Sequence, residues 1–423
     1  MNKQITTIIL GLGGRGRDIY GRYILEHPQE IKVVGIADVD EEKLVRVGKD
    51  FSLPKKACFT SAEAILAQPK MADCALICTQ DKDHVNHAKM ALEKGYHLLL
   101  EKPVSDSIEA CEELVELAKI HKRHVVVCHV LRYTPFYNTI KDCITKGDIG
   151  EVVTVQAIEN VGYWHQAHSF VRGNWRKTSE SSPMILAKCC HDLDILLWLV
   201  GKSCKQVSSF GNNYLFKEEK APEGATLRCT DNCLARKECP YDAVRYYVED
   251  PVTGVKGGKK DWPINIVAPV PTEESVMEAL KTGPYGRCVY HCDNDVVDHQ
   301  VVNMLCEDGV TINFTMTAFS DRCYRYLKVM GTKGCIEADM DKNVVSVFKF
   351  GEEPIHYMID NETSIEGHGG GDEKMMDQFI ELMRNPEHIS SLQTSLEKSI
   401  ESHIVALKAE ASRLEEGKVF TVK

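Results

Sequence analysis

The sequence predicts an α/β protein whose first domain is a doubly wound parallel sheet, and three observations carry this prediction. Apolar, strand-like runs alternate with helix-like stretches over residues 1–130, which is typical of a parallel sheet covered by helices. A glycine-rich turn follows the first run. The chain has 423 residues, more than the roughly 250–300 at which a single core stops growing. We therefore expect a second domain over residues 131–423.

The first apolar run, residues 5–10, leads directly into the glycine-rich turn Gly11-Leu12-Gly13-Gly14-Arg15-Gly16. A helix-like stretch follows, then a second apolar run over residues 31–37 and Asp38. This order is the context that a Rossmann dinucleotide-binding turn requires, because its backbone N–H groups reach a pyrophosphate at a helix N-terminus. Asp38 would bind the ribose hydroxyls and repel a 2′-phosphate, so we predict NAD rather than NADP. The alternative is a strand–turn–helix that binds no ligand.

The alternation of strands and helices continues to residue 130. Strands are expected at residues 72–79, 97–100 and 124–130, and helices at 84–94 and 107–121. Ligands of such sheets lie beyond the carboxyl ends of the strands. The polar residues at these ends are Thr79, Glu101, Lys102, His129 and Arg132. We therefore expect Lys102, which stands between an acid and a proline, to lie in the cofactor crevice.

Composition and charge exclude several classes of partner. The hydrophobic share of 43% and the charged share of 27% are those of an ordinary globular protein. A net charge of −11 argues against a nucleic acid as the main partner. The first apolar run breaks at Gly11 and no apolar stretch is long enough to span a bilayer, so we expect a cytoplasmic protein without a membrane partner. Its 17 cysteines should mostly be reduced, buried or bound to metal.

The chain resembles the Gfo/Idh/MocA family of NAD(P)-dependent oxidoreductases, which act mainly on sugars and cyclitols. The resemblance covers residues 5–201 and about 295–420. It rests on the glycine-rich turn, on Asp38 and on the segments CTQDKDH (78–84), EKP (101–103), RYTPFY (132–137), KGDIGEV (146–152), CHDLDILLWLVG (190–201) and SHIVALKAEASRLEEGKVF (402–420). It implies an α/β second domain built on a large, mostly antiparallel sheet. Because the outer face of that sheet commonly makes subunit contacts in the family, we expect a homodimer or homotetramer.

The resemblance places the active site between the second sheet and the nicotinamide. The family lysine of the EKP segment contacts the substrate hydroxyl and the nicotinamide ribose and helps to relay the proton, which assigns this role to Lys102. The alternative is a structural lysine that pairs with Glu101 or caps a backbone group. The residues expected to bind the cofactor are Gly11, Gly13, Gly14, Arg15, Gly16, Asp38, Thr79, His84, Glu101 and Lys102.

The second catalytic candidate is His191, which stands in the place of the family histidine. The family usually has an aspartate four residues earlier, whereas this chain has Ala187 there. Lys188, Asp192 or Asp194 would have to take over the missing contact. The alternative is a histidine buried at a helix N-terminus.

Residues 159–176 are dense in aromatic and basic side chains, and they predict a polyol or sugar acid pocket. Indole faces stack on sugar rings, while histidine and arginine bind hydroxyls or an anionic group. A partly buried loop with satisfied polar groups is the alternative. The predicted substrate residues are Trp164, His165, His168, Arg172, Trp175, Lys188 and, ahead of a later helix, His368.

Cysteines gather in an unfamiliar segment, about residues 210–290, which we expect to be an insertion in the second domain. Cys229, Cys233 and Cys239 are closely spaced, and Cys288 and Cys292 follow later. Structural zinc takes four Cys or His ligands, often from closely spaced pairs. We expect zinc on Cys229, Cys233, Cys239 and one further residue, with free thiols or a disulfide as the alternatives.

The predicted function is an NAD-dependent dehydrogenase that acts on a CH–OH group of a sugar, sugar acid or cyclitol. One alternative uses the same cofactor in a glycoside hydrolase, through transient oxidation, elimination and re-reduction. A second alternative is a non-catalytic dinucleotide sensor. The presence of both Lys102 and His191 argues against the sensor.

Overall fold

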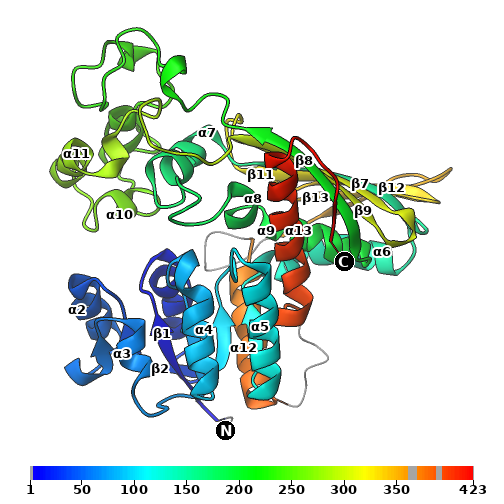
Figure 1. Ribbon diagram of the computed structural model, residues 1–423, viewed down its shortest axis with the longest axis horizontal. Helices are drawn as coiled ribbons and strands as arrows, with labels where there is room; N and C mark the ends of the chain where they lie inside the picture. Colours follow the sequence, from blue (N-terminus) through cyan, green and yellow to red (C-terminus); the bar gives the residue numbers. More distant parts are fainter. Residues whose placement is uncertain (1–2, 361–368, 387–392, 423) are drawn as a thin grey trace.

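The computed structural model describes residues 3–360, 369–386 and 393–422. Figure 1 shows the N-terminal sheet and its helices below a second, larger sheet, with a further group of short helices beyond one end of that larger sheet. Within the described residues, none of the helices combines the length and the hydropathy needed to cross a membrane.

Six parallel strands form the first sheet, in the order β3-β2-β1-β4-β5-β6. Its strands are β1 (Ile5–Leu10), β2 (Ile31–Ala37), β3 (Cys58–Phe59), β4 (Cys74–Ile77), β5 (His97–Leu100) and β6 (Val125–Val127). Its helices are α1 (Arg22–Glu26), α2 (Glu41–Asp50), α3 (Ala62–Leu66), α4 (His84–Glu93) and α5 (Ile108–Ile120). The strand order reverses on either side of β1, which confirms the predicted doubly wound sheet.

Helix α12 (Gly371–Arg384) returns to this domain from near the end of the chain. Met375, Met376 and Phe379 belong to the same core cluster as Ile5 and Ile9 of β1. Residues that are far apart in the sequence therefore complete the N-terminal core, and Figure 1 shows α12 within the N-terminal domain.

A nine-stranded mixed sheet forms the second domain, in the order β14-β13-β12-β11-β7-β10-β9-β8-β15. Only β7 and β10 are parallel neighbours, so the sheet is mostly antiparallel, as predicted. Its strands are β7 (Val152–Asn160), β8 (Cys204–Asn212), β9 (His299–Cys306), β10 (Thr311–Thr317), β11 (Tyr324–Gly331), β12 (Gly334–Asp339), β13 (Val344–Lys349), β14 (Ile355–Met358) and β15 (Phe420–Thr421).

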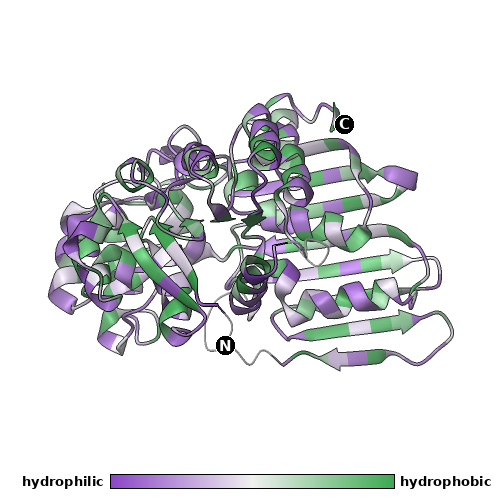
Figure 2. Cartoon of the chain, turned by 90° about the horizontal axis from the view of Figure 1, so that it is seen from below, coloured by the Kyte–Doolittle hydropathy of each residue, from purple (hydrophilic) through white to green (hydrophobic). Residues whose placement is uncertain are grey.

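One face of this sheet is covered by helices. Buried and exposed residues alternate along β9 and β10, and Figure 2 shows the corresponding alternation of hydropathy along strands of the sheet. Leu193 of α9 and Val405 of α13 share a core cluster with Phe314 of β10. The helices of this domain are α6 (Pro135–Thr145), α7 (Tyr163–His165), α8 (Met184–Ala187), α9 (Cys190–Val200) and α13 (Leu396–Leu414).

Residues 213–298 join β8 to β9 and contain the short helices α10 (Ile264–Val267) and α11 (Glu273–Thr282). We call this segment the insertion. Val244, Tyr247, Ile264 and Leu280 belong to an apolar cluster of its own. The insertion therefore has its own small core, which Figure 1 shows at the upper left, around α10 and α11.

Candidate active site

Lys102 reaches from the first domain to the second. The backbone N–H of Glu101 still bonds to β4, to the carbonyl oxygen of Ile77 at 2.9 Å, so the strand end holds Lys102 at the carboxyl edge of the sheet. Its ammonium group donates a hydrogen bond to the backbone carbonyl oxygen of Ala187 at 2.8 Å. Ala187 is the position at which the family usually has an aspartate. A neutral backbone acceptor therefore binds Lys102 there.

His191 lies in the first turn of α9, four residues after Ala187, and is 6% exposed. The ring of His129 meets it edge-on, with the two centroids 5.8 Å apart. The ring of His403 on α13 also meets that of His129 edge-on, at 5.4 Å between centroids. Burial lowers the pKa of His129 well below its ordinary value and that of His403 to about 3. His129 and His403 are therefore neutral at physiological pH.

The acids next to His191 have partners elsewhere. Asp194 makes a two-point ion pair with Arg132, at 2.6 and 2.7 Å. Asp192 accepts from the guanidinium of Arg325 on β11, at 2.7 Å. Both carboxylates are therefore bound to arginines. These contacts do not support the prediction that Asp192 or Asp194 takes over the role of the family aspartate.

Lys188, the third candidate for that role, lies 3.3 Å from Glu159 of β7. Glu159 also lies 3.0 Å from Arg325. Burial raises the pKa of Glu159, and the two cations oppose this rise. Lys188 is thus held at the end of β7 by a buried carboxylate.

Aromatic side chains of α7 meet the insertion beside this group. The ring of Trp164 stacks on Tyr246, with centroids 5.8 Å apart, and lies 5.4 Å from Trp262. His165 meets Trp262 edge-on at 5.1 Å. Burial and the nearby charge of Lys188 lower the pKa of His165 well below its ordinary value. Trp262 is 41% exposed, so this cluster, made of residues from α7 and the insertion, presents an aromatic face to solvent.

The predicted substrate residues His168 and Arg172 bind other groups of the protein. His168 is 3% exposed, bonds to the hydroxyl of Tyr247 at 2.7 Å and stacks on Tyr285. Arg172 donates to the backbone carbonyls of Arg287 and Tyr241, both at 2.7 Å. These contacts favour structural roles for His168 and Arg172.

Trp175 donates its indole N–H to Asp81 at 3.1 Å. Ser181 and Ser182 donate to the same carboxylate oxygen, at 3.0 and 3.2 Å. Asp81 follows β4, so these bonds connect the two domains beside the site. His368 lies outside the described residues.

The glycine-rich turn leaves open space where a pyrophosphate would lie. A Cβ on Gly11 or Gly16 would clash with backbone oxygen, at 2.3 and 2.0 Å, and Gly11 has a φ of +89°. A Cβ on Gly13 or Gly14 would meet no atom within 4 Å. Gly11 and Gly16 are therefore needed for the tight turn, while Gly13 and Gly14 face a space that a ligand can fill.

Asp38 lies at the end of β2, next to this turn. One of its carboxylate oxygens accepts from the backbone N–H of Leu12 at 2.6 Å, and the other from that of Asp40 at 2.9 Å. The acid is thereby fixed beside the glycine-rich turn, the position from which the Rossmann acid binds the ribose.

Arg15 connects the turn to the segment that carries Lys102. Its guanidinium donates to Glu101 at 2.6 Å, to Asp372 at 2.5 Å and to the hydroxyl of Tyr20 at 2.5 Å. Burial alone would raise the pKa of Glu101, but the charges of Arg15 and Lys102 lower it overall. Arg15 and Glu101 thus form a support beneath the crevice, and sequence reasoning missed the partner on α12.

Thr79 and His84 support the same segment. The two ring nitrogens of His84 lie 2.7 Å from the carbonyl oxygen of Pro103 and 3.0 Å from that of Thr79. The hydroxyl of Thr79 lies 3.0 Å from a ring nitrogen of His87. Through His84, the end of β4 is tied to the segment that follows Lys102.

The predicted metal ligands lie together in the insertion. Cys229, Cys233 and Cys239 line one cavity, and Cys288 lines it as well. None of the 17 cysteines forms a disulfide. Within residues 3–360, 369–386 and 393–422, no three His, Cys, Asp or Glu side chains take up a geometry that would hold a metal ion.

Comparison with known proteins identifies the family. The model of the oxidoreductase family with an NAD-binding Rossmann fold, GFO_IDH_MocA, matches residues 5–129, and the model of its C-terminal alpha/beta domain matches residues 141–402. The protein YteT of Bacillus subtilis (strain 168) is 22% identical over 390 residues, which are 88% of each chain. Inositol 2-dehydrogenase of Corynebacterium glutamicum is 25% identical over 202 residues, which are 48% of this chain and 56% of that protein.

Among solved structures, that of an inositol dehydrogenase homolog complexed with NAD+ from Azotobacter vinelandii has the same fold, with a TM-score of 0.70 at 14% identity. The superposition covers 99% of this chain and 97% of the other. Both domains of the family are thus present, in the family's order and with its fold. This protein belongs to the Gfo/Idh/MocA family of NAD-dependent oxidoreductases.

Proposed function

We propose that this protein oxidises or reduces a hydroxyl or keto position of a sugar, sugar acid or cyclitol with NAD. The observation that carries the proposal is the hydrogen bond from Lys102 to Ala187. This bond brings the ammonium group of Lys102, which can exchange a proton, from the first domain to the backbone one turn before His191. His191 belongs to the second domain. Oxidation of a hydroxyl requires groups that can take its proton, and such groups act from hydrogen-bond distance.

The residues at the carboxyl edge of the first sheet fit NAD. The space beside Gly13 and Gly14 would take the pyrophosphate, whose charge the backbone N–H groups of the turn would bind. Asp38 would accept from the ribose hydroxyls and would repel the phosphate of NADP. When it is bound, NAD supplies the hydride acceptor for the carbon that carries the hydroxyl.

Lys102 and His191 would divide the proton transfer between them. An ammonium group has three N–H donors, and one of those of Lys102 is used by Ala187. The other two are available to a substrate hydroxyl and the nicotinamide ribose. His191, at the start of α9, would receive the proton of the substrate hydroxyl and pass it to solvent.

The aromatic cluster beside these groups suits a polyol ring. Trp164 and Trp262 would stack on the apolar face of the ring, while Lys188 and His165 would bind the hydroxyls of the ring. The inositol 2-dehydrogenase of Corynebacterium glutamicum, whose similarity covers 48% of this chain, supports a sugar-like or cyclitol substrate. As in other members of the family, we expect the outer face of the nine-stranded sheet to form a homodimer or homotetramer.

A panel of sugars, sugar acids, cyclitols and aryl glycosides tests the proposal, with NADH absorbance and glycoside release followed in the same samples. We expect NADH to form with at least one free polyol. Glycoside release without net NADH would instead identify a redox-neutral glycoside hydrolase. A folded protein that binds NAD and gives neither product would contradict both and favour the sensor.

A further inference from the structure

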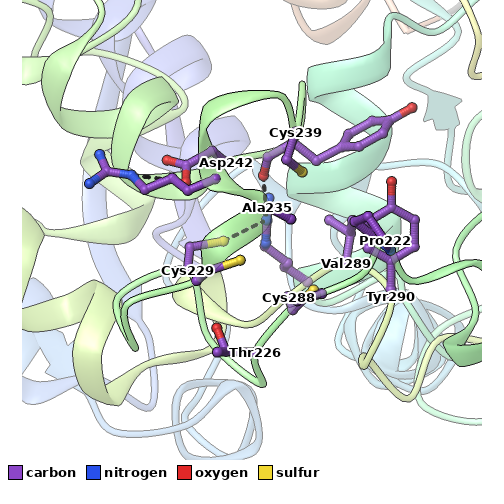
Figure 3. Close-up of a pocket in the computed structure, with 14 residues that line it drawn as sticks. Pro222, Thr226, Cys229, Ala235, Cys239, Asp242, Cys288, Val289 and Tyr290 are labelled. Atoms are coloured by element: carbon purple, nitrogen blue, oxygen red, sulfur yellow. Dashed lines mark hydrogen bonds and ion pairs between the residues drawn. The ribbon is translucent and has the colours of Figure 1, made fainter.

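The insertion contains a small cavity surrounded by four cysteine side chains. Cys229, Cys233, Cys239 and Cys288 all line it, and Figure 3 shows the labelled sulfur atoms of Cys229, Cys239 and Cys288 around it. The cavity volume is about 10 Å³, close to the smallest that holds one water molecule. The cavity therefore fits a single small ion and no organic ligand.

Backbone hydrogen bonds bring the four residues together from two segments. The N–H of Cys229 donates to the carbonyl oxygen of Gly286, and that of Cys288 to Leu227, both at 2.9 Å. Arg228 and Arg287 form an antiparallel bridge between the segments. Cys229 and Cys288 are therefore diagonal neighbours on one face of this bridge, although they are far apart in the sequence.

Cys233 and Cys239 come from the loop that follows this bridge. Asn232 has a φ of +58° and turns the chain directly before Cys233. A single 3₁₀ turn, Leu234–Lys237, separates the two cysteines, and the N–H of Cys239 donates to the carbonyl oxygen of Ala235 at 3.0 Å. The local structure thus supplies a second pair of sulfur atoms to the same cavity.

A buried positive charge lies against this cavity. Arg172 lines it and is 3% exposed. One of its terminal nitrogens lies 3.7 Å from the sulfur of Cys229, and the guanidinium also donates to two backbone carbonyl oxygens. None of the ion pairs among the described residues includes Arg172. A buried guanidinium keeps its charge and needs a counter-charge. The carboxylate of Asp242 also lines the cavity but is paired with Arg236 at 3.1 Å, so the cysteines can supply this counter-charge.

We propose that Cys229, Cys233, Cys239 and Cys288 bind one zinc ion. Four thiolates and Zn²⁺ carry a net charge of two minus, which supplies the counter-charge that Arg172 needs and leaves the site with one negative charge. Each thiol loses its proton to solvent as its sulfur binds the metal, with no change of oxidation state. Because the sulfur atoms do not have ligand geometry in this structure, binding requires their side chains to rotate toward the cavity that they share.

The zinc ion would stabilise the substrate side of the protein. Arg172 belongs to the helical segment Gln166–Arg172, which directly follows Trp164 and His165 of α7. Its bonds to Arg287 and Tyr241 tie that segment to the cysteine-bearing parts of the insertion. The metal would therefore fix the insertion against the aromatic cluster, without touching the dinucleotide site.

Metal analysis of the full chain, purified without added metal, tests the proposal. We expect about one zinc per chain, as for structural four-cysteine sites. Cys288→Ser should lose most of this zinc in the presence of a competing chelator. Cys292→Ser is the matched control, because Cys292 is only four residues away and bonds to the carbonyl oxygen of Cys288 at 3.2 Å but does not line the cavity. It should keep its zinc.

A second measurement on the unmodified chain covers the case in which Cys288→Ser does not fold. After exchange of the metal for Co²⁺, we expect the absorption bands of a tetrahedral tetrathiolate site. Chelation should expose four additional reactive thiols and leave NAD affinity unchanged. Only traces of zinc in a folded chain, bound iron instead of zinc, an absent cobalt–thiolate spectrum, or equal loss of zinc in both variants would overturn the proposal.

Discussion

The ammonium nitrogen of Lys102 lies 2.8 Å from the backbone carbonyl oxygen of Ala187. Lys102 follows β5 of the first sheet, whereas Ala187 ends α8 of the second domain. A backbone oxygen cannot be replaced by mutation and carries no full charge. This contact therefore orients the lysine without the negative charge that the family aspartate would bring to the site.

Loss of Lys102 or His191 should impair turnover and spare cofactor binding. General acid–base groups typically contribute about 10²–10⁴-fold, so Lys102→Ala and His191→Ala should each lower kcat by about that factor. Lys102→Arg should be nearly as poor, because a guanidinium cannot release its proton. NAD affinity, measured by titration, is the control. Near-normal turnover of His191→Ala would mean that Lys102 or Lys188 accepts the proton.

Asp38 should determine the preference for NAD over NADP. Replacing it by alanine removes the carboxylate that would bind the ribose and repel the 2′-phosphate, so the difference between the two dissociation constants should narrow. Asp40→Ala is the matched control, because Asp40 instead accepts from Lys43 at the start of α2. Tighter binding of NADP than NAD by the unmodified protein would contradict the prediction.

Arg15→Met should destabilise the protein, because it leaves the carboxylates of Glu101 and Asp372 without their shared cation. The cost should be about 3 kcal/mol, the low end for breaking a buried ion pair, since the Arg15 side chain is 28% exposed. The pKa of Glu101 is lowered in the folded protein. The contribution of the ionised Glu101 to stability is thus present at neutral pH. It is lost as the pH falls below 4.5, the ordinary pKa of a glutamate.

Denaturant unfolding at pH 7 and near pH 4 would measure this difference. The gap in unfolding free energy between the unmodified protein and Arg15→Met should shrink at the lower pH. Arg22→Met is the control, because its ion pair with Glu26 is exposed and should contribute at most about 1 kcal/mol. Equal losses of unfolding free energy in Arg15→Met and Arg22→Met would show that the ion pairs of Arg15 do not stabilise the protein more than an exposed pair does.

His403 should make stability depend on pH between 7 and 5. Burial lowers its pKa to about 3, below the ordinary value of 6.5, so the folded state favours the neutral imidazole. Its contribution is complete above pH 6.5 and declines as the pH falls, by about 2 kcal/mol at pH 5. His403→Gln keeps an acceptor for the N–H of Val104 and removes the titration. Its stability should therefore fall less between pH 7 and 5, and an unchanged slope would count against this assignment.

Trp262→Ala should weaken substrate binding without affecting NAD. A stacking contact with a sugar ring is worth up to about 1.5 kcal/mol, so KM for the polyol should rise about tenfold. Tyr214→Ala removes another aromatic ring of the insertion, one that is 59% exposed and outside the cluster, and should leave KM unchanged. A rise in KM for both variants would indicate a general loosening of the insertion.

The sequence by itself determined the first domain and its glycine-rich turn. Strand propensity, helix periodicity and the conformational freedom of Gly11 are local properties, so they can be read from neighbouring residues. The same holds for the delivery of Lys102 to the end of a buried strand. The family motifs extended this prediction to the second sheet and to His191.

Only the tertiary structure decided which side chains meet across long distances in the chain. It pairs Arg15 with Asp372, brings Trp262 to Trp164 and brings Cys288 to the cavity that Cys229 also lines. It also directs His168 and Arg172 into the insertion, where their polar groups bind the protein. Such contacts depend on how separate elements pack, and packing is set by the shape and burial of whole surfaces, which no local pattern encodes.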